Sequence, residues 1–123
     1  MFSGDTLFVG GCGRFFEGNA QQMLQNMDLY ATLPGSTQVF CAHEYTEGNY
    51  KFLNSVDANT CGRKFAEIQQ IRAEGRPTIP SSISEELKYN LFMKCHDPSL
   101  QQILGVSTAV DAMHELRTRK NNF

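Results

Sequence analysis

The distribution of charge divides the chain in two near residue 43. Residues 1–43 contain one basic and three acidic residues and six of the ten glycines, whereas residues 44–123 contain ten basic and ten acidic residues. Few charges and many glycines are typical of short buried strands joined by turns, and dense charge is typical of helices with one solvated face. We therefore expect α/β structure over residues 1–43 and a helical part over residues 44–123.

The first part carries a strand, helix, strand pattern. Leu7–Val9 is a short apolar run between glycines, which is typical of a buried strand. Asn19 can cap a helix whose apolar residues recur at helical spacing, namely Ala20, Met23, Leu24, Met27 and Ala31. Residues 37–42 are apolar and β-branched and predict a second strand. This order indicates part of an α/β sheet.

Cap residues predict a series of helices in the second part. Residue types that favour the N-cap position precede apolar positions at helical spacing, and we expect helices to begin at Thr46, Thr60, Ser82, Asp97 and Thr108. Residues 76–80 contain two prolines, and each disfavours helix in the residue before it. An extended segment should therefore separate the second and third of these helices.

Composition excludes several classes of protein. The length suits a single domain, and the formal net charge of −2 argues against nucleic acid or an anionic membrane as the main partner. No stretch approaches the ~18 consecutive apolar residues that a membrane span needs. The four cysteines form no C-x-x-C pair, and no secretory signal precedes them. We expect a cytoplasmic protein, with the mitochondrion or another organelle as the alternative, and a chain that begins abruptly at Met1, as if inside a domain.

Two residues near the ends of the predicted strands could bind a metal ion. Asp5 precedes the first strand and His43 follows the second. Loops beyond strand ends hold ligands in α/β sheets, and carboxylate and imidazole are usual ligands of zinc and iron. The alternatives are a turn residue for Asp5 and a satisfied surface group for His43, and on composition alone these are favoured.

Two further features have a binding interpretation and a structural one. The glycine-rich segment 10–18 lets backbone approach a ligand and offers Arg14 to a carboxylate, or it is only a strained connection. Its Cys12 could be a nucleophile, although a core thiol is the better interpretation. Arg117 and Lys120 are three residues apart and could bind one anion from a shared helix face, or they form a solvated helix end.

Several motifs in order resemble the glyoxalase II family, the hydroxyacylglutathione hydrolases of the metallo-β-lactamase superfamily. They are Phe2-Ser3-Gly4-Asp5-Thr6-Leu7-Phe8, Gly11-Cys12-Gly13-Arg14-Phe15-Phe16-Glu17-Gly18, Ala42-His43-Glu44-Tyr45-Thr46 and the terminal Leu116-Arg117-Thr118-Arg119-Lys120-Asn121-Asn122-Phe123. The resemblance implies the C-terminal part of an αββα sandwich over residues 1–43, followed by a helical glutathione-binding domain over residues 44–123.

The family resemblance also implies a reaction and its residues. The expected activity is hydrolysis of S-D-lactoylglutathione to glutathione and D-lactate by a hydroxide shared between two divalent metal ions, zinc first and iron or manganese as alternatives. Asp5 matches the carboxylate that bridges the metals, and His43 matches a histidine ligand of the second metal. The implied substrate-binding residues are Arg14, Phe15, Phe16, His43, Tyr45, Arg117 and Lys120.

One family motif is absent from the 123 residues. The T-H-x-H-x-D-H metal motif does not occur, so Asp5 and His43 are left as two ligands where a tetrahedral site needs four. We therefore predict a chain that is catalytically incomplete by itself. The alternative is a non-catalytic truncated paralogue that binds glutathione or associates with itself through exposed sheet surfaces.

Overall fold

A computed structural model describes residues 1–14 and 19–123. The elements, in chain order, are β1 (Phe2–Gly4), β2 (Leu7–Phe8), β3 (Gly11–Cys12), α1 (Ala20–Ala31), β4 (Gln38–Cys41), α2 (Thr46–Val56), α3 (Ala58–Ala73), β5 (Ser81–Ser82), α4 (Ile83–Tyr89), the 3-10 helix η1 (Leu91–Met93), α5 (Pro98–Leu104) and α6 (Ala109–Asn121). The fold therefore combines helices with small sheets, as expected for α/β plus helical structure.

The strands form one three-stranded sheet and one hairpin. In the sheet the order is β1-β4-β5: β1 runs parallel to β4 with Phe2 opposite Phe40, and β5 runs antiparallel to β4 with Ser82 opposite Gln38. The hairpin pairs β2 with β3, Leu7 opposite Cys12. Because β5 comes from the second part of the chain, residues on both sides of position 43 share one sheet.

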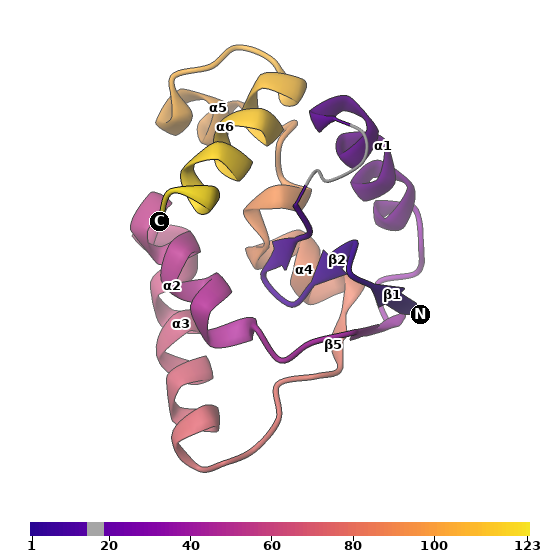
Figure 1. Cartoon of the computed structure of the whole chain (residues 1–123), viewed down its shortest axis with the longest axis vertical. Coiled ribbons are helices and arrows are strands. Elements are labelled where there is room, and N and C mark those ends of the chain that lie inside the picture. The colour runs from indigo at the N-terminus through magenta and orange to yellow at the C-terminus, as the bar shows by residue number, and fades with distance from the viewer. Residues whose placement is uncertain (15–18) are drawn as a thin grey trace.

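The helices enclose the strands on several sides. The strands lie between α1 on one side and the packed pair of α2 and α3 on the other, and α6 lies next to α1 (Figure 1). One apolar core runs through the described parts of the chain, with fully buried side chains that include Leu7, Val39, Tyr50, Phe92 and Leu116. Among the described residues, no helix combines the length and the hydropathy needed to cross a bilayer.

Local cap signals predicted most helix starts correctly. Asn19 and Gln22 form a reciprocal capping box at the start of α1. The side chain of Ser82 accepts from the Glu85 backbone N–H at the start of α4, and Thr108 does the same for Asp111 at the start of α6. Asp97 caps α5 with proline at its first position, as the sequence indicated.

One predicted helix start was wrong, and at a second helix, α2, the start was correct but the cap residue was not. Helix α3 begins at Ala58, and its cap is Asp57, whose carboxylate accepts from the backbone N–H of Thr60. Thr60 is therefore inside the helix. Thr46 is the first residue of α2 rather than its cap; its side chain is buried, and its hydroxyl oxygen lies 2.5 Å from that of Thr78. Asp57 therefore supplies the cap of α3 that the sequence assigned to Thr60, whereas the side chain of Tyr45, the N-cap residue of α2, makes no capping hydrogen bond.

Candidate functional site

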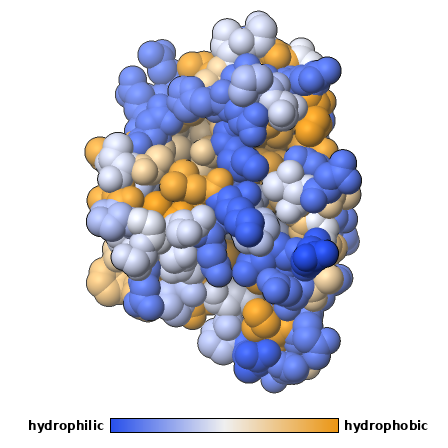
Figure 2. Space-filling view, turned by 180° about the vertical axis from the view of Figure 1, so that it is seen from behind, coloured by the Kyte–Doolittle hydropathy of each residue, from blue (hydrophilic) through white to orange (hydrophobic). Residues whose placement is uncertain are grey.

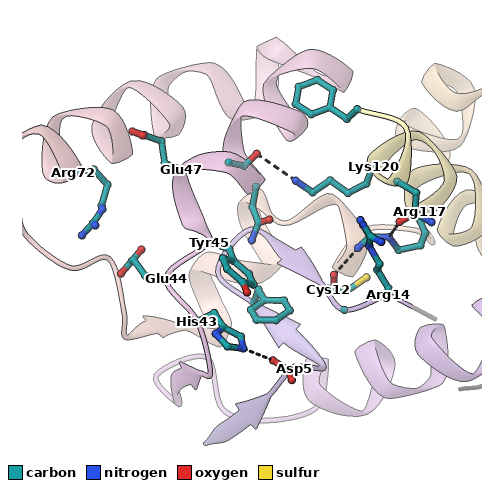
Figure 3. Close-up of a pocket in the computed structure, with 16 residues that line it drawn as sticks. Asp5, Cys12, Arg14, His43, Glu44, Tyr45, Glu47, Arg72, Arg117 and Lys120 are labelled. Carbon is teal, nitrogen blue, oxygen red and sulfur yellow. Dashed lines mark hydrogen bonds and ion pairs between the residues drawn. The ribbon is translucent and has the colours of Figure 1, made fainter. Parts of the chain in front are cut away.

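A cavity of about 970 Å³ opens between the β2–β3 hairpin, the loop after β4 and the helices α2, α3 and α6 (Figure 3). Its size falls in the range of small-molecule sites. The lining residues are Asp5, Phe8, Cys12, Gly13, Arg14, His43, Glu44, Tyr45, Glu47, Gly48, Asn49, Arg72, Arg117, Lys120, Asn121 and Phe123. Most of the residues proposed from the sequence thus meet in one place. Phe15 and Phe16 lie outside the described residues.

Asp5 and His43 lie side by side in this cavity. His43 Nε2 is 3.1 Å from Asp5 Oδ1, and both side chains are largely exposed. Asp5 directly follows β1, a strand that the sequence did not predict. The prediction that Asp5 precedes the first strand was therefore wrong. Because β1 and β4 are parallel, their carboxyl ends meet at one edge, and the residues beyond them converge there.

The pair suits part of a metal site. Donor atoms of one tetrahedral zinc ion lie about 3.4 Å apart, given Zn–N and Zn–O bonds of about 2.1 Å. The observed separation is therefore compatible with both groups binding one ion. Among the residues that the structure describes, no group of three or more His, Cys, Asp or Glu side chains could hold a metal. Asp5 and His43 supply two donors, and a tetrahedral site needs four.

Aromatic rings form the surface beside this pair. The rings of His43 and Tyr45 are stacked with centroids 4.8 Å apart, and the centroid of the Phe8 ring lies 5.4 Å from that of Tyr45. Tyr45 remains 54% exposed, so one side of its ring is open to the cavity. An open ring of this kind can pack against the peptide part of a ligand while its hydroxyl hydrogen-bonds.

Three cationic side chains gather at another wall of the cavity. Arg14 follows β3, and Arg117 and Lys120 belong to α6. Figure 3 shows Arg14 and Arg117 together, with Lys120 nearby. Among the described residues none of the three forms an ion pair with a carboxylate. Burial, and then the charges of Arg117 and Arg14, lower the pKa of Lys120. A wall with this concentration of positive charge favours an anionic ligand.

The two helical cations are held in different ways. Arg117 is only 6% exposed and donates from Nη1 to the Cys12 carbonyl over 2.7 Å, and from Nε to Asn121 over 3.0 Å. A solvated helix end is therefore the wrong interpretation for Arg117. Lys120 lies over the ring of Phe52 and reaches the Gly48 carbonyl over 3.5 Å, and its side chain is partly exposed at the cavity.

Cys12 is a core thiol. Its side chain is 4% exposed, and burial raises its pKa to about 12 in spite of the nearby Arg117 charge. At neutral pH it is protonated, which argues against a nucleophilic role. Its backbone carbonyl is the part that matters for the site, because it accepts from Arg117.

Polar residues that the sequence did not single out hold the hairpin in place. Glu86 Oε1 accepts from the Gly10 N–H over 2.9 Å, and Asn90 Nδ2 donates to the Gly11 carbonyl over 3.1 Å. Asn49 Nδ2 donates to the Val9 carbonyl over 3.2 Å. No local pattern in the sequence marks these three residues, because their burial depends on contacts with the distant hairpin.

Comparison with known proteins identifies the family. The family model described as "Hydroxyacylglutathione hydrolase C-terminus" matches residues 44–123. The chain belongs to this family. The cytoplasmic hydroxyacylglutathione hydrolase of Arabidopsis thaliana is 45% identical over 126 residues, covering all of this chain and 49% of the relative.

Bacterial relatives show the same partial coverage. The hydroxyacylglutathione hydrolase of Serratia proteamaculans is 41% identical, with 51% of its length covered, and that of Brucella anthropi is 44% identical, with 49% covered. The chain therefore spans about half the length of the hydroxyacylglutathione hydrolases it matches.

Proposed function

We propose that this chain is the glutathione-binding part of a hydroxyacylglutathione hydrolase, acting on S-D-lactoylglutathione to release glutathione and D-lactate. One observation carries the proposal: a single cavity joins the adjacent Asp5 and His43 to a cationic wall that contains Lys120. Family membership supports it, since the matched relatives are hydroxyacylglutathione hydrolases.

The charges of the cavity suggest how the substrate lies. The glycine carboxylate of glutathione would bind at Arg14 and Lys120, with the buried Arg117 adding charge behind them. Tyr45 stands between this wall and His43 in Figure 3, where it can support the cysteinyl part of the peptide. The thioester would then point toward Asp5 and His43.

Asp5 and His43 would hold part of a pair of divalent metal ions, zinc first, with iron or manganese as alternatives. Such ions would supply Lewis-acid activation of water and of the thioester carbonyl. Asp5 and His43 keep their carboxylate and imidazole exposed to the cavity, and each is held in place by the strand before it. Because Asp5 and His43 would supply only two of the donors that the metal ions need, the chain would be catalytically incomplete by itself.

Binding of a glutathione thioether tests the proposal without requiring turnover. We expect S-methylglutathione to shift the NMR signals of cavity residues, and Lys120→Met to weaken binding about tenfold, since it keeps an unbranched side chain and removes the charge that lies over Phe52. Lys51→Met, on an exposed site of α2 outside the cavity, is the control and should leave the affinity unchanged. No binding, or equal effects of both variants, would contradict the proposal.

A non-catalytic, self-associating module is the second candidate, and the exposed apolar surface favours it. Phe2 is 87% exposed on β1, an edge strand of the described sheet, and packs on Phe40. The face seen from behind shows apolar patches among polar side chains (Figure 2). Sedimentation should show oligomers that Phe2→Ser converts to monomers, while Leu29→Ser, on α1, leaves them intact. A wild-type monomer at ~100 μM would contradict this candidate.

We also propose a cytoplasmic location, which the name of the Arabidopsis relative supports. A fluorescent fusion that collected in an organelle would contradict it.

A further inference from the structure

A third wall of the cavity has no role in the function proposed above. It consists of Glu44, Glu47 and Arg72, which Figure 3 shows grouped on the side away from Arg14, Arg117 and Lys120. Tyr45 lies between the two groups in this view. The cavity therefore presents a purely cationic wall and a wall of mixed charge, with the Asp5–His43 pair between them.

Within the mixed wall, the carboxylate of Glu44 is already hydrogen-bonded to another residue of the chain. Its carboxylate accepts from the Thr78 backbone N–H over 3.0 Å and from the Thr78 hydroxyl. Burial opposes its charge, but these bonds and the charge of Arg72 outweigh burial, so its pKa lies below the ordinary value. Glu44 is therefore anionic and fixed, and it tethers the segment after α3 to the start of α2.

Arg72 and Glu47 keep free binding capacity. Arg72, in the last turn of α3, donates from Nη1 to the Arg76 carbonyl over 2.8 Å, which leaves most of the five guanidinium N–H donors for other partners. Glu47, in the first turn of α2, makes no hydrogen bond or ion pair to any residue that the structure describes. Both side chains are exposed, and both line the cavity.

We propose that Arg72 and Glu47 bind the γ-glutamyl end of the glutathione moiety, Arg72 at its α-carboxylate and Glu47 at its α-ammonium. The inference rests on the proposed function. The γ-glutamyl residue carries these two opposite charges on one carbon atom, so it calls for one cationic and one anionic partner close together. The mixed wall places a cation and a carboxylate on the same side of the cavity (Figure 3).

The charges also set the direction of binding. The glycine end of glutathione bears a carboxylate alone and matches the cationic wall, whereas the γ-glutamyl end is zwitterionic and matches Arg72 and Glu47. In the reversed orientation the ammonium would face Arg14, Arg117 and Lys120, and like charges in a cavity repel. With the peptide lying in this direction, the sulfur in its middle is directed toward His43 and Asp5.

Two ligands isolate the contribution of the γ-glutamyl residue. S-Methylglutathione carries it, and N-acetyl-S-methyl-L-cysteinylglycine replaces it by an acetyl group while keeping the amide. Measured by NMR titration of the full chain, the acetylated ligand should bind the wild type about five- to tenfold more weakly. Equal affinities of the two ligands would overturn this inference and leave the proposed function standing.

Variants of the wall complete the experiment. Arg72→Ala and Glu47→Gln should each weaken S-methylglutathione about three- to fivefold and leave the acetylated ligand unchanged. Arg63→Ala, at an exposed position of α3 outside the cavity, should change neither. If a variant lost the same amount of affinity for both ligands, the effect would be structural and the inference would be overturned. If neither ligand bound the wild type at millimolar concentration, the proposed function would fail together with it.

Discussion

The carboxyl group of Glu86 lies fully buried beneath the hairpin that carries part of the cavity. It accepts from the Gly10 N–H and from Asn90 Nδ2, and it shares a 2.6 Å hydrogen bond with the Ser81 hydroxyl. Burial raises its pKa, although these hydrogen bonds oppose the shift. A carboxyl in this state ties α4 to the hairpin and makes the stability of the fold depend on pH.

Replacement by glutamine should remove that dependence. In Glu86→Gln the amide imitates the protonated carboxyl, because its oxygen can accept from Gly10 and Asn90 while its nitrogen donates to Ser81. Since the folded pKa of Glu86 lies above the ordinary 4.5, the native state holds a proton that the unfolded state has lost between these values. The wild type should therefore lose stability relative to the variant as pH rises from 4.5 through the folded pKa.

The free energy of unfolding of the wild type should fall by about 1.4 kcal/mol for each pH unit by which the folded pKa of Glu86 exceeds its ordinary value. Urea unfolding of both proteins across this pH range measures it, with Glu67→Gln on the exposed face of α3 as control. A constant difference between the wild type and Glu86→Gln would show that Glu86 titrates as an ordinary carboxyl.

Site residues differ in how far the sequence could indicate them. Asp5 and His43 stand beside apolar runs that end in loops, so a local pattern already marked them as candidates. Glu86 could not be found in this way, because a glutamate in a charge-dense helix is usually solvated. Its burial depends on Gly10, which is 76 residues away in the chain.

At the scale of elements, the hairpin positions Asp5 through a close backbone contact. Gly13 donates its N–H to the Thr6 carbonyl, and a Cβ atom added at Gly13 would lie 2.1 Å from the Asp5 carbonyl oxygen. Neither backbone segment can move without disturbing the β2–β3 pair. Gly13 therefore allows the chain after β3 to pass directly beside the residue that follows β1.

Gly13→Ala should accordingly lower the free energy of unfolding by about 1–3 kcal/mol, the usual effect of overpacking a close contact. Gly48→Ala is the matched control, because a Cβ there meets nothing within 4 Å and the residue lies in α2. That change should leave stability unchanged or raise it by up to about 1 kcal/mol. Chemical denaturation compares the two, and equal stabilities would argue against the contact.

Elements defined by local signals were predictable, and those defined by distant partners were not. The starts of α1 and α6 depend on a side chain and a backbone group three residues apart, which the sequence displays. Strand β1 exists because β4 pairs with it from almost forty residues away, and two-residue β5 has no periodic pattern of its own. Such pairings are tertiary and override local propensity.

At the scale of the whole molecule, the cavity depends on segments from both parts of the chain. The Arg117 guanidinium in α6 holds the Cys12 carbonyl in β3, and Asn90 holds Gly11 in the same strand. The part with few charges thus contributes Asp5 and His43, and the charge-dense part contributes the buried and half-buried cations. In the proposed function, binding of a glutathione ligand would need both parts, whereas a complete metal site would need more donors than Asp5 and His43 supply among the described residues.

Turnover by the isolated chain is the measurement that separates these two requirements. With Asp5 and His43 as its two proposed ligands, the chain should hydrolyse S-D-lactoylglutathione no faster than zinc alone, even when zinc is supplied in equimolar amount. S-Methylglutathione should still bind, because the contacts proposed for Lys120 and Arg14 do not involve the metal. The opposite outcome is turnover well above the zinc background in the wild type and none above it in Asp5→Ala. That result would show that the chain assembles a working centre, for instance by sharing donors between copies, and it would contradict catalytic incompleteness.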